Sequence, residues 1–245
     1  MKKIALLCLL LSSFVFVQAQ TDNSKLDSDD FIERSRQSLL NHCWIKLSGR
    51  LNSRSKEHGL IKATISCAAQ LVPNQVTFKS TINGQQSVKM THKFGGNQHL
   101  AIIDEEYKKA DSIYQKIGIK STDLSLTFMY WDMLNELKSE RLGLMAHPCR
   151  VFRLQNPDND KEFVRVWLSE NYLAPVKVEW RYGRITGEAD QSLQFKKFAE
   201  KNQVWIPTEI LIKNKKGKTQ IKFDKKKAQA AFSQFIPENL YKIEK

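Results

Sequence analysis

Apolar and polar residues alternate with a period of two over most of the chain from residue 43 to residue 223. This period is typical of β-strands with one apolar face, because successive side chains of a strand point to opposite faces. The alternating segments are 43–51, 59–67, 76–82, 88–94, 99–103, 149–154, 164–168, 176–182, 191–198, 204–212 and 219–223. The pattern predicts a mainly β (α+β) protein built on about ten antiparallel strands.

The first two alternating segments predict a hairpin. A turn centred on Ser55 sets Ile45 opposite Ile65 and brings the apolar residues of both strands to one face. In that register Cys43 lies opposite Cys67, at the Cα separation of about 4.5–5.5 Å that a disulfide accepts. The alternative is two buried thiols that pack as small hydrophobic groups.

The third and fourth segments are joined by Asn-Gly at 83–84, a dipeptide typical of a two-residue turn. Such a tight turn would place Phe78 opposite Lys89 and mix an apolar face with a polar one. We therefore predict a wider loop that continues through residues 85–87.

Spacing closer to that of a helix replaces the alternation around residues 28–42, in 104–117 and in the apolar-rich segment 121–135. A continuous antiparallel sheet of about ten strands curls or splits. We expect a curved sheet or an unclosed β-barrel with helices covering its mouth. Pro207 lies inside the strand 204–212 and predicts an edge or a bulge there, since proline has no N–H for the ladder.

The chain begins with Met-Lys-Lys, an apolar run over 4–17 and a small-residue site that ends at Ala19. This arrangement predicts a secretory signal over residues 1–19, followed by a single domain over 20–245. An uncleaved anchor is the alternative, but the run is shorter than the roughly 20 residues that span a bilayer.

The formal net charge is +13, and loss of the two lysines of the leader leaves +11. A basic protein favours acidic partners, and export argues against nucleic acid as the physiological partner. Four lysines surround the predicted last hairpin turn at 214–217: Lys213, Lys215, Lys216 and Lys218. They predict either a membrane-facing patch, at about 1 kcal/mol per lysine near an anionic leaflet, or a solvated edge that resists strand pairing.

The sequence contains no G-x-S-x-G motif, phosphate loop, dinucleotide fingerprint or paired C-x-x-C. His147 and Cys149 lack a third group that would complete a metal site or a nucleophilic pair. The acidic residues 104–106 are best explained as the start of a helix. We predict a protein that is not an enzyme and that holds no cofactor or metal.

Several segments resemble the outer-membrane lipoprotein-sorting family, the LolA-like carriers. The resemblance covers most of the mature chain, although its motifs are diffuse structural patterns. It rests on STDLSLTFMYW at 121–131, RLG at 141–143, CRV at 149–151, VRVWL at 164–168, APV at 174–176, WIKLSGR at 44–50 and VWIP at 204–207.

The resemblance implies an unclosed β-barrel, covered by helices, whose apolar cavity shields a lipid or lipoprotein acyl chain in the periplasm or envelope of a Gram-negative-type bacterium. Each methylene exposed to water costs about 0.8 kcal/mol, so such a chain needs shielding. The implied partners are the acyl chain and either an anionic membrane surface or envelope transport proteins. We expect a monomer.

The residues expected to line this cavity are the inward-facing ones and two from a candidate lid at 128–131. They are Ile45, Leu47, Ile65, Phe78, Met90, Phe94, Phe128, Trp131, Val166, Leu168, Val178, Trp180, Ile206 and Ile210. The same residues could instead pack into a filled barrel, and the lid could be ordinary packing of a helix on a sheet. The protein would then be a non-transporting envelope interaction protein that uses its basic edge.

Overall fold

The computed structural model describes residues 22–39, 42–73, 75–93, 100–103, 113–114, 116–119, 121–143, 147–233 and 235–242. The predicted signal over 1–19, Phe94 and residues 104–112 lie outside these ranges. Within them, no helix is long and apolar enough to cross a membrane.

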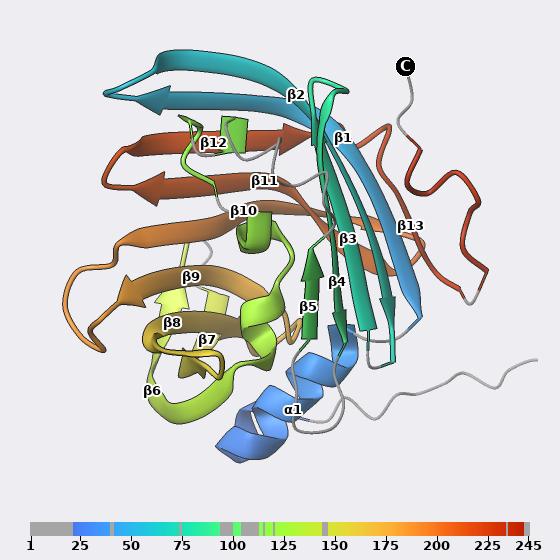
Figure 1. Cartoon of the computed structure of the whole chain (residues 1–245). Helices are drawn as coiled ribbons and strands as arrows, with labels where there is room; N and C mark the ends of the chain where they lie inside the picture. Colours follow the sequence, from blue (N-terminus) through green and yellow to red (C-terminus); the bar gives the residue numbers. More distant parts are fainter. Residues whose placement is uncertain are drawn as a thin grey trace, which may run out of the picture.

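One antiparallel sheet of thirteen strands makes up the protein (Figure 1). The strands run in the order β5-β4-β3-β2-β1-β12-β11-β10-β9-β8-β7-β6, and β13 pairs with the beginning of β1. Their bounds are β1 Cys43–Ser55, β2 Gly59–Val72, β3 Gln75–Ile82, β4 Gln86–Lys93, β5 Leu100–Ile103, β6 Asp132–Leu142, β7 His147–Asn156, β8 Asn159–Ser169, β9 Pro175–Tyr182, β10 Gln191–Lys201, β11 Val204–Asn214, β12 Gly217–Phe223 and β13 Gln229–Phe232. Since β5 and β6 are not paired with each other, the predicted curved and unclosed sheet is confirmed.

The set of covering helices that we predicted is not supported. One long helix, α1 (Ser28–Leu39), is present in the described part of the chain, together with the short 3-10 turns η1 (Asn23–Lys25), η2 (Ser121–Leu124) and η3 (Thr127–Tyr130). The expected helical segment 121–135 already becomes strand β6 at residue 132. The alternation did not indicate β6 because two register shifts against β7 interrupt its period of two.

Helix α1 packs on β7 through its apolar face. Phe31 and Ile32 are buried, and the ring of Phe31 stacks on Phe152 with centroids 5.7 Å apart. The guanidinium of Arg150 lies 4.5 Å from the centroid of the Phe31 ring, and its Nε donates to Glu136 Oε1 at 2.7 Å. One buried arginine therefore joins α1, β6 and β7.

The first hairpin has the predicted apolar face but a different register. Cys43 lies opposite Leu71 and Cys67 lies opposite Leu47, because the turn occupies residues 56–58 and not the region around Ser55. The pairing is displaced by four positions, and an even displacement leaves every side chain on its own face. Alternation determines the face of a residue, whereas the length of the turn determines its partner.

The predicted disulfide between Cys43 and Cys67 is therefore wrong. The residue opposite Cys67 is four positions from Cys43, or about 13 Å along the strand. This exceeds the Cα separation of about 7 Å that a disulfide can bridge. Cys43, Cys67 and Cys149 are all free and buried.

The loop between β3 and β4 is wider than two residues, as predicted, but it is three residues long, and residues 86 and 87, which we placed in the loop, begin β4. Ile82 pairs with Gln86 across residues 83–85, and Phe78 lies opposite Met90 as the apolar pattern required. The apolar pattern therefore excludes the two-residue turn that the Asn-Gly dipeptide suggests, whereas the length of the loop decides the partner.

Burial raises the pKa of the Cys67 thiol to about 12 and the pKa values of the Cys43 and Cys149 thiols to about 11. We expect iodoacetamide to label none of the three rapidly in the folded protein at about pH 8, because the thiolate is the reactive form. In denaturant without reductant, all three should be labelled in the mature chain. Intact-mass measurement counts the adducts, and a single adduct after denaturation would contradict the observed register.

The hydrogen bonds from Arg150 lower the pKa of Glu136, against the opposing effect of burial. Such a carboxylate stabilises the fold above its unfolded-state pKa of about 4.3, and this contribution is lost as the pH falls through the lower folded-state value. We expect Glu136→Gln to lower the free energy of unfolding by about 2 kcal/mol near pH 7, and by less near pH 3. Urea unfolding measures both values, with the exposed Glu238→Gln as control. An equal loss of unfolding free energy at the two pH values would contradict a stabilising role for the charge of Glu136.

Candidate functional site

An apolar cavity of about 110 Å³ lies between the inner face of the sheet and residues 124–130, which we call the roof segment. Side chains from β1, β2, β3, β10, β11 and β12 form its floor, and the roof segment lines it on the other side. The lining residues of this inner cavity are Ile45, Leu47, Cys67, Ala68, Ala69, Leu71, Val76, Phe78, Leu124, Ser125, Leu126, Tyr130, Phe195, Pro207, Ile210 and Phe223.

The free space lies over a row of residues of unequal size. Ala69 pairs with Ile45 on one side and with Phe78 on the other, so the three side chains point to the same face of neighbouring strands. The alanine methyl group is much shorter than its two neighbours. This difference in length leaves room above β2 that the roof segment does not fill.

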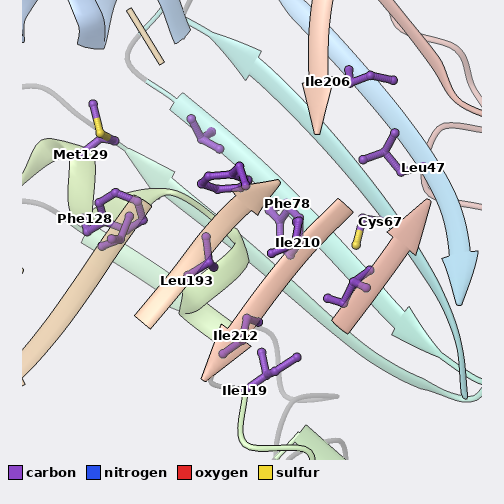
Figure 2. Close-up of a cluster of buried hydrophobic side chains, with 14 of the residues drawn as sticks. Leu47, Cys67, Phe78, Ile119, Phe128, Met129, Leu193, Ile206, Ile210 and Ile212 are labelled. Carbon is purple, nitrogen blue, oxygen red and sulfur yellow. The ribbon is translucent and has the colours of Figure 1, made fainter. Parts of the chain in front are cut away.

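The side chains of Phe128 and Met129 anchor the roof segment. Phe128 packs edge-on against Trp180 with centroids 5.5 Å apart, and Met129 is fully buried (Figure 2). Arg36 of α1 donates from Nε to Met129 O at 2.8 Å and from Nη2 to Trp131 O at 2.7 Å. Helix α1 therefore holds the end of the roof segment through its backbone.

The other end of the inner face is filled by the chain itself. Tyr114 is buried, and its hydroxyl lies 2.7 Å from Ser80 Oγ. Thr219 donates from Oγ1 to Ile117 O, and Asn214 donates from Nδ2 to Gly118 O at 2.8 Å. These polar contacts fix the segment around residues 113–119 across the sheet. The remaining cavity is smaller than the roughly 300–1,000 Å³ of a typical ligand pocket.

Some of the residues that we expected to line a cavity do so, whereas most of the others are packed in the core. Four of them line the inner cavity: Ile45, Leu47, Phe78 and Ile210. Eight are packed in the core: Ile65, Met90, Phe128, Val166, Leu168, Val178, Trp180 and Ile206. Trp131 is half-buried against the same core. Trp180 on β9 is covered by Phe128 of the roof segment.

Sequence reasoning missed the part of the lining that comes from the roof segment and from chain turns. Leu124 and Leu126 belong to consecutive short turns, and Leu126 has a left-handed backbone with φ of 58°. Such a segment has no periodic pattern that would identify its inward-facing residues. Leu71 and Val76 could have been found, since they continue the inward faces of β2 and β3.

The polar chemistry of the inner cavity is limited. Burial raises the pKa of Cys67 to about 12, and burial also raises the pKa of Tyr130, so both groups are neutral near pH 7. No group of three His, Cys, Asp or Glu side chains among the described residues could hold a metal ion. An apolar and uncharged space of this kind favours hydrocarbon over polar ligands.

No protein-family model matches the chain, and no curated protein matches its sequence. Solved structures do match its fold. A DUF1329 family protein from Desulfovibrio piger has a TM-score of 0.62 at 8% identity, over 87% of this chain and 95% of that one. An outer membrane lipoprotein-sorting protein domain from Vibrio parahaemolyticus has a TM-score of 0.59 at 11% identity, over 87% and 95%.

A LolA superfamily protein from Nitrosomonas europaea has a TM-score of 0.57 at 11% identity and covers 89% of this chain and 98% of its own. At such low identity the likeness concerns the fold. The resemblance noted in the sequence and the arrangement of thirteen strands agree with it. This chain therefore has the LolA-like fold of the lipoprotein-sorting proteins.

Proposed function

We propose that this protein is a periplasmic, non-enzymatic carrier that shields part of a lipid or lipoprotein acyl chain in its inner cavity. The observation that carries the proposal is an apolar, uncharged cavity between the sheet and a separate roof segment in a LolA-like fold. Each methylene that leaves water gains about 0.8 kcal/mol, so even a few terminal methylenes supply useful affinity. The predicted secretory signal supports the location.

A cavity of about 110 Å³ accepts only part of a long acyl chain, so binding requires movement of the roof segment. Two features of this segment favour such movement. Leu126 holds a left-handed conformation, which costs a non-glycine residue about 1–3 kcal/mol. The clamp from α1 consists of two hydrogen bonds from the single side chain of Arg36. Opening would relieve the strain at Leu126 and extend the cavity along the inner face.

Filling the space above β2 tests the proposal. We expect Ala69→Trp to weaken the binding of a fluorescent long-chain fatty acid at least about tenfold, equivalent to about 1.4 kcal/mol, because the indole takes the place of the hydrocarbon. Fluorescence titration measures the affinity, and circular dichroism checks the fold. The matched control is Ala231→Trp on β13, where the side chain is half-buried outside the inner cavity. Equal binding by the two variants would place the ligand elsewhere.

A second function is supported by the lysines of the β11–β12 hairpin. Lys213 lies directly opposite Lys218, and such like charges destabilise a strand pair. Lys215 reaches Asp190 at 3.2 Å, and Lys216 occupies the turn. We propose that this basic hairpin docks the protein on an anionic leaflet or on an acidic envelope transport protein.

Charge reversal in the basic hairpin tests the membrane part of this proposal. We expect Lys216→Glu/Lys218→Glu to reduce binding to phosphatidylglycerol vesicles more than tenfold, since each lysine near the surface contributes about 1 kcal/mol. Vesicle co-sedimentation at low and high salt measures the effect. Lys62→Glu/Lys161→Glu has the same net charge and should bind nearly as well as the wild type. If vesicle binding changes neither with salt nor in either variant, the lysines act only as a solvated edge.

A further inference from the structure

The sheet splits between β9 and β10. These strands pair only over Lys177–Trp180 and Gln191–Gln194, although β10 continues for seven more residues. Over Phe195–Lys201 strand β10 keeps β11 as its partner on one side. On the other side, no strand in the described part of the chain pairs with it. Unpaired N–H and C=O groups along such an edge are a template for another strand.

Two prolines and a bulge explain the split. The register between β10 and β11 shifts around Lys197, and Phe198 then pairs with Pro207. This position confirms the bulge predicted for Pro207, since proline donates no hydrogen bond to the ladder. A bulge bends its strand, and here it turns β10 away from β9. Strand β9 itself begins at Pro175, which also lacks an N–H.

A cleft of about 630 Å³ lies along the split, and we call it the edge cleft. Trp205 and Glu209 of β11 line the edge cleft, and Phe195 lines both the edge cleft and the inner cavity, so the two spaces meet at this side chain. The walls of the edge cleft include Tyr172, Val176, Lys196, Lys197, Phe198 and Trp205. The ring centroids of Tyr172 and Trp205 are 5.3 Å apart, and each residue is 50% exposed. An exposed aromatic pair beside a free strand edge is typical of a binding surface.

We propose that the edge cleft binds an extended, acidic segment of a partner protein, which adds as a strand to the Phe195–Lys201 edge of β10. The backbone of the segment pairs with the unpaired groups of β10, and its alternate apolar side chains pack on Trp205 and Phe198. The regular spacing of donors and acceptors along a strand edge is matched by another peptide backbone, and not by a sugar or a lipid headgroup.

The charges of the edge cleft favour an acidic segment. Lys196 and Lys197 line the cleft, and the Nζ of Lys197 lies 3.2 Å from Glu209 Oε2. The same Glu209 accepts a hydrogen bond from Gln220 at 2.7 Å, so its charge is already matched within the protein. Since Lys197 and Glu209 match each other, Lys196 supplies the excess positive charge of the lining, in a chain whose formal net charge is +13.

The test uses the mature protein and a fluorescent decapeptide in which glutamate alternates with valine and phenylalanine. Two further versions of this probe carry N-methyl groups on alternate residues, so that each version removes the N–H donors of one edge only. Fluorescence anisotropy measures their affinities. Hydrogen exchange measured by mass spectrometry reports protection of the amides at 195–201.

We expect the unmodified peptide to bind and to protect the amides at 195–201. N-methylation of one edge should weaken binding at least tenfold, and N-methylation of the opposite edge should have little effect. Trp205→Ala and Lys196→Glu should each weaken binding about five- to tenfold. The exposed control variants Phe235→Ala and Lys62→Glu should bind like the wild type. Ala69→Trp should also bind the peptide, which separates this proposal from that of the inner cavity.

Three results would overturn the proposal. Equal affinity of the two N-methylated peptides would exclude pairing with the edge of β10. A Trp205-dependent dimer in analytical ultracentrifugation, with no binding of the peptide, would assign the edge cleft to a second copy of the chain. Binding of an oligosaccharide or of anionic vesicles through Trp205, again without the peptide, would assign the aromatic pair to that ligand.

Discussion

The pairing of β1 with β12 holds the two halves of this protein together. Strand β1 pairs with β2 on one side and with both β12 and β13 on the other, so it joins β2–β5 to the strands that follow in the second half of the chain. Gly49 lies at the start of this contact, where a Cβ atom would overlap with Lys222 O. The absence of a side chain at Gly49 lets the two strands approach to hydrogen-bonding distance. Without this pairing there would be two smaller sheets and no common inner face.

A single curved sheet has to cover its concave side, and this chain does so with its own central segment. Residues 113–114 and 116–119 fill one end through polar contacts with Ser80, Thr219 and Asn214. The roof segment covers the other end less completely, because Ala69 lies beneath it between two larger residues. The inner cavity thus results from incomplete filling of an otherwise packed interior. Binding of hydrocarbon would enlarge a space that already exists.

Strand β10 contributes to both proposed sites. Phe195 lines the inner cavity and also the edge cleft, at the point where the pairing with β9 ends. The bulge beside Phe195 turns the strand and so produces the free edge. A partner bound at that edge would lie next to one end of the inner cavity, with the side chain of Phe195 between the partner and an acyl chain.

The alternation along the chain predicted eleven of the thirteen strands, the faces of their side chains and the class of the fold, but neither β6 nor β13. The period of two identified inward-facing residues such as Leu47, Phe78 and Ile210 correctly, because the direction of a side chain on a strand is a local property. It also excluded the register that sets Phe78 opposite Lys89, because that register mixes apolar and polar faces, and the structure pairs Phe78 with Met90. Strand β6 was missed because its bulges interrupt the period.

Which of the inward-facing residues border a cavity depends on contacts between distant parts of the chain. Trp180 and Ile45 have the same pattern in the sequence, yet Phe128 covers the first, whereas the second faces open space above Ala69. The partner of Cys67 was likewise decided by the length of a turn and not by the alternation. Coverage by distant segments, turn length and the split beside β10 all depend on contacts between residues far apart in the chain, which a local pattern does not contain.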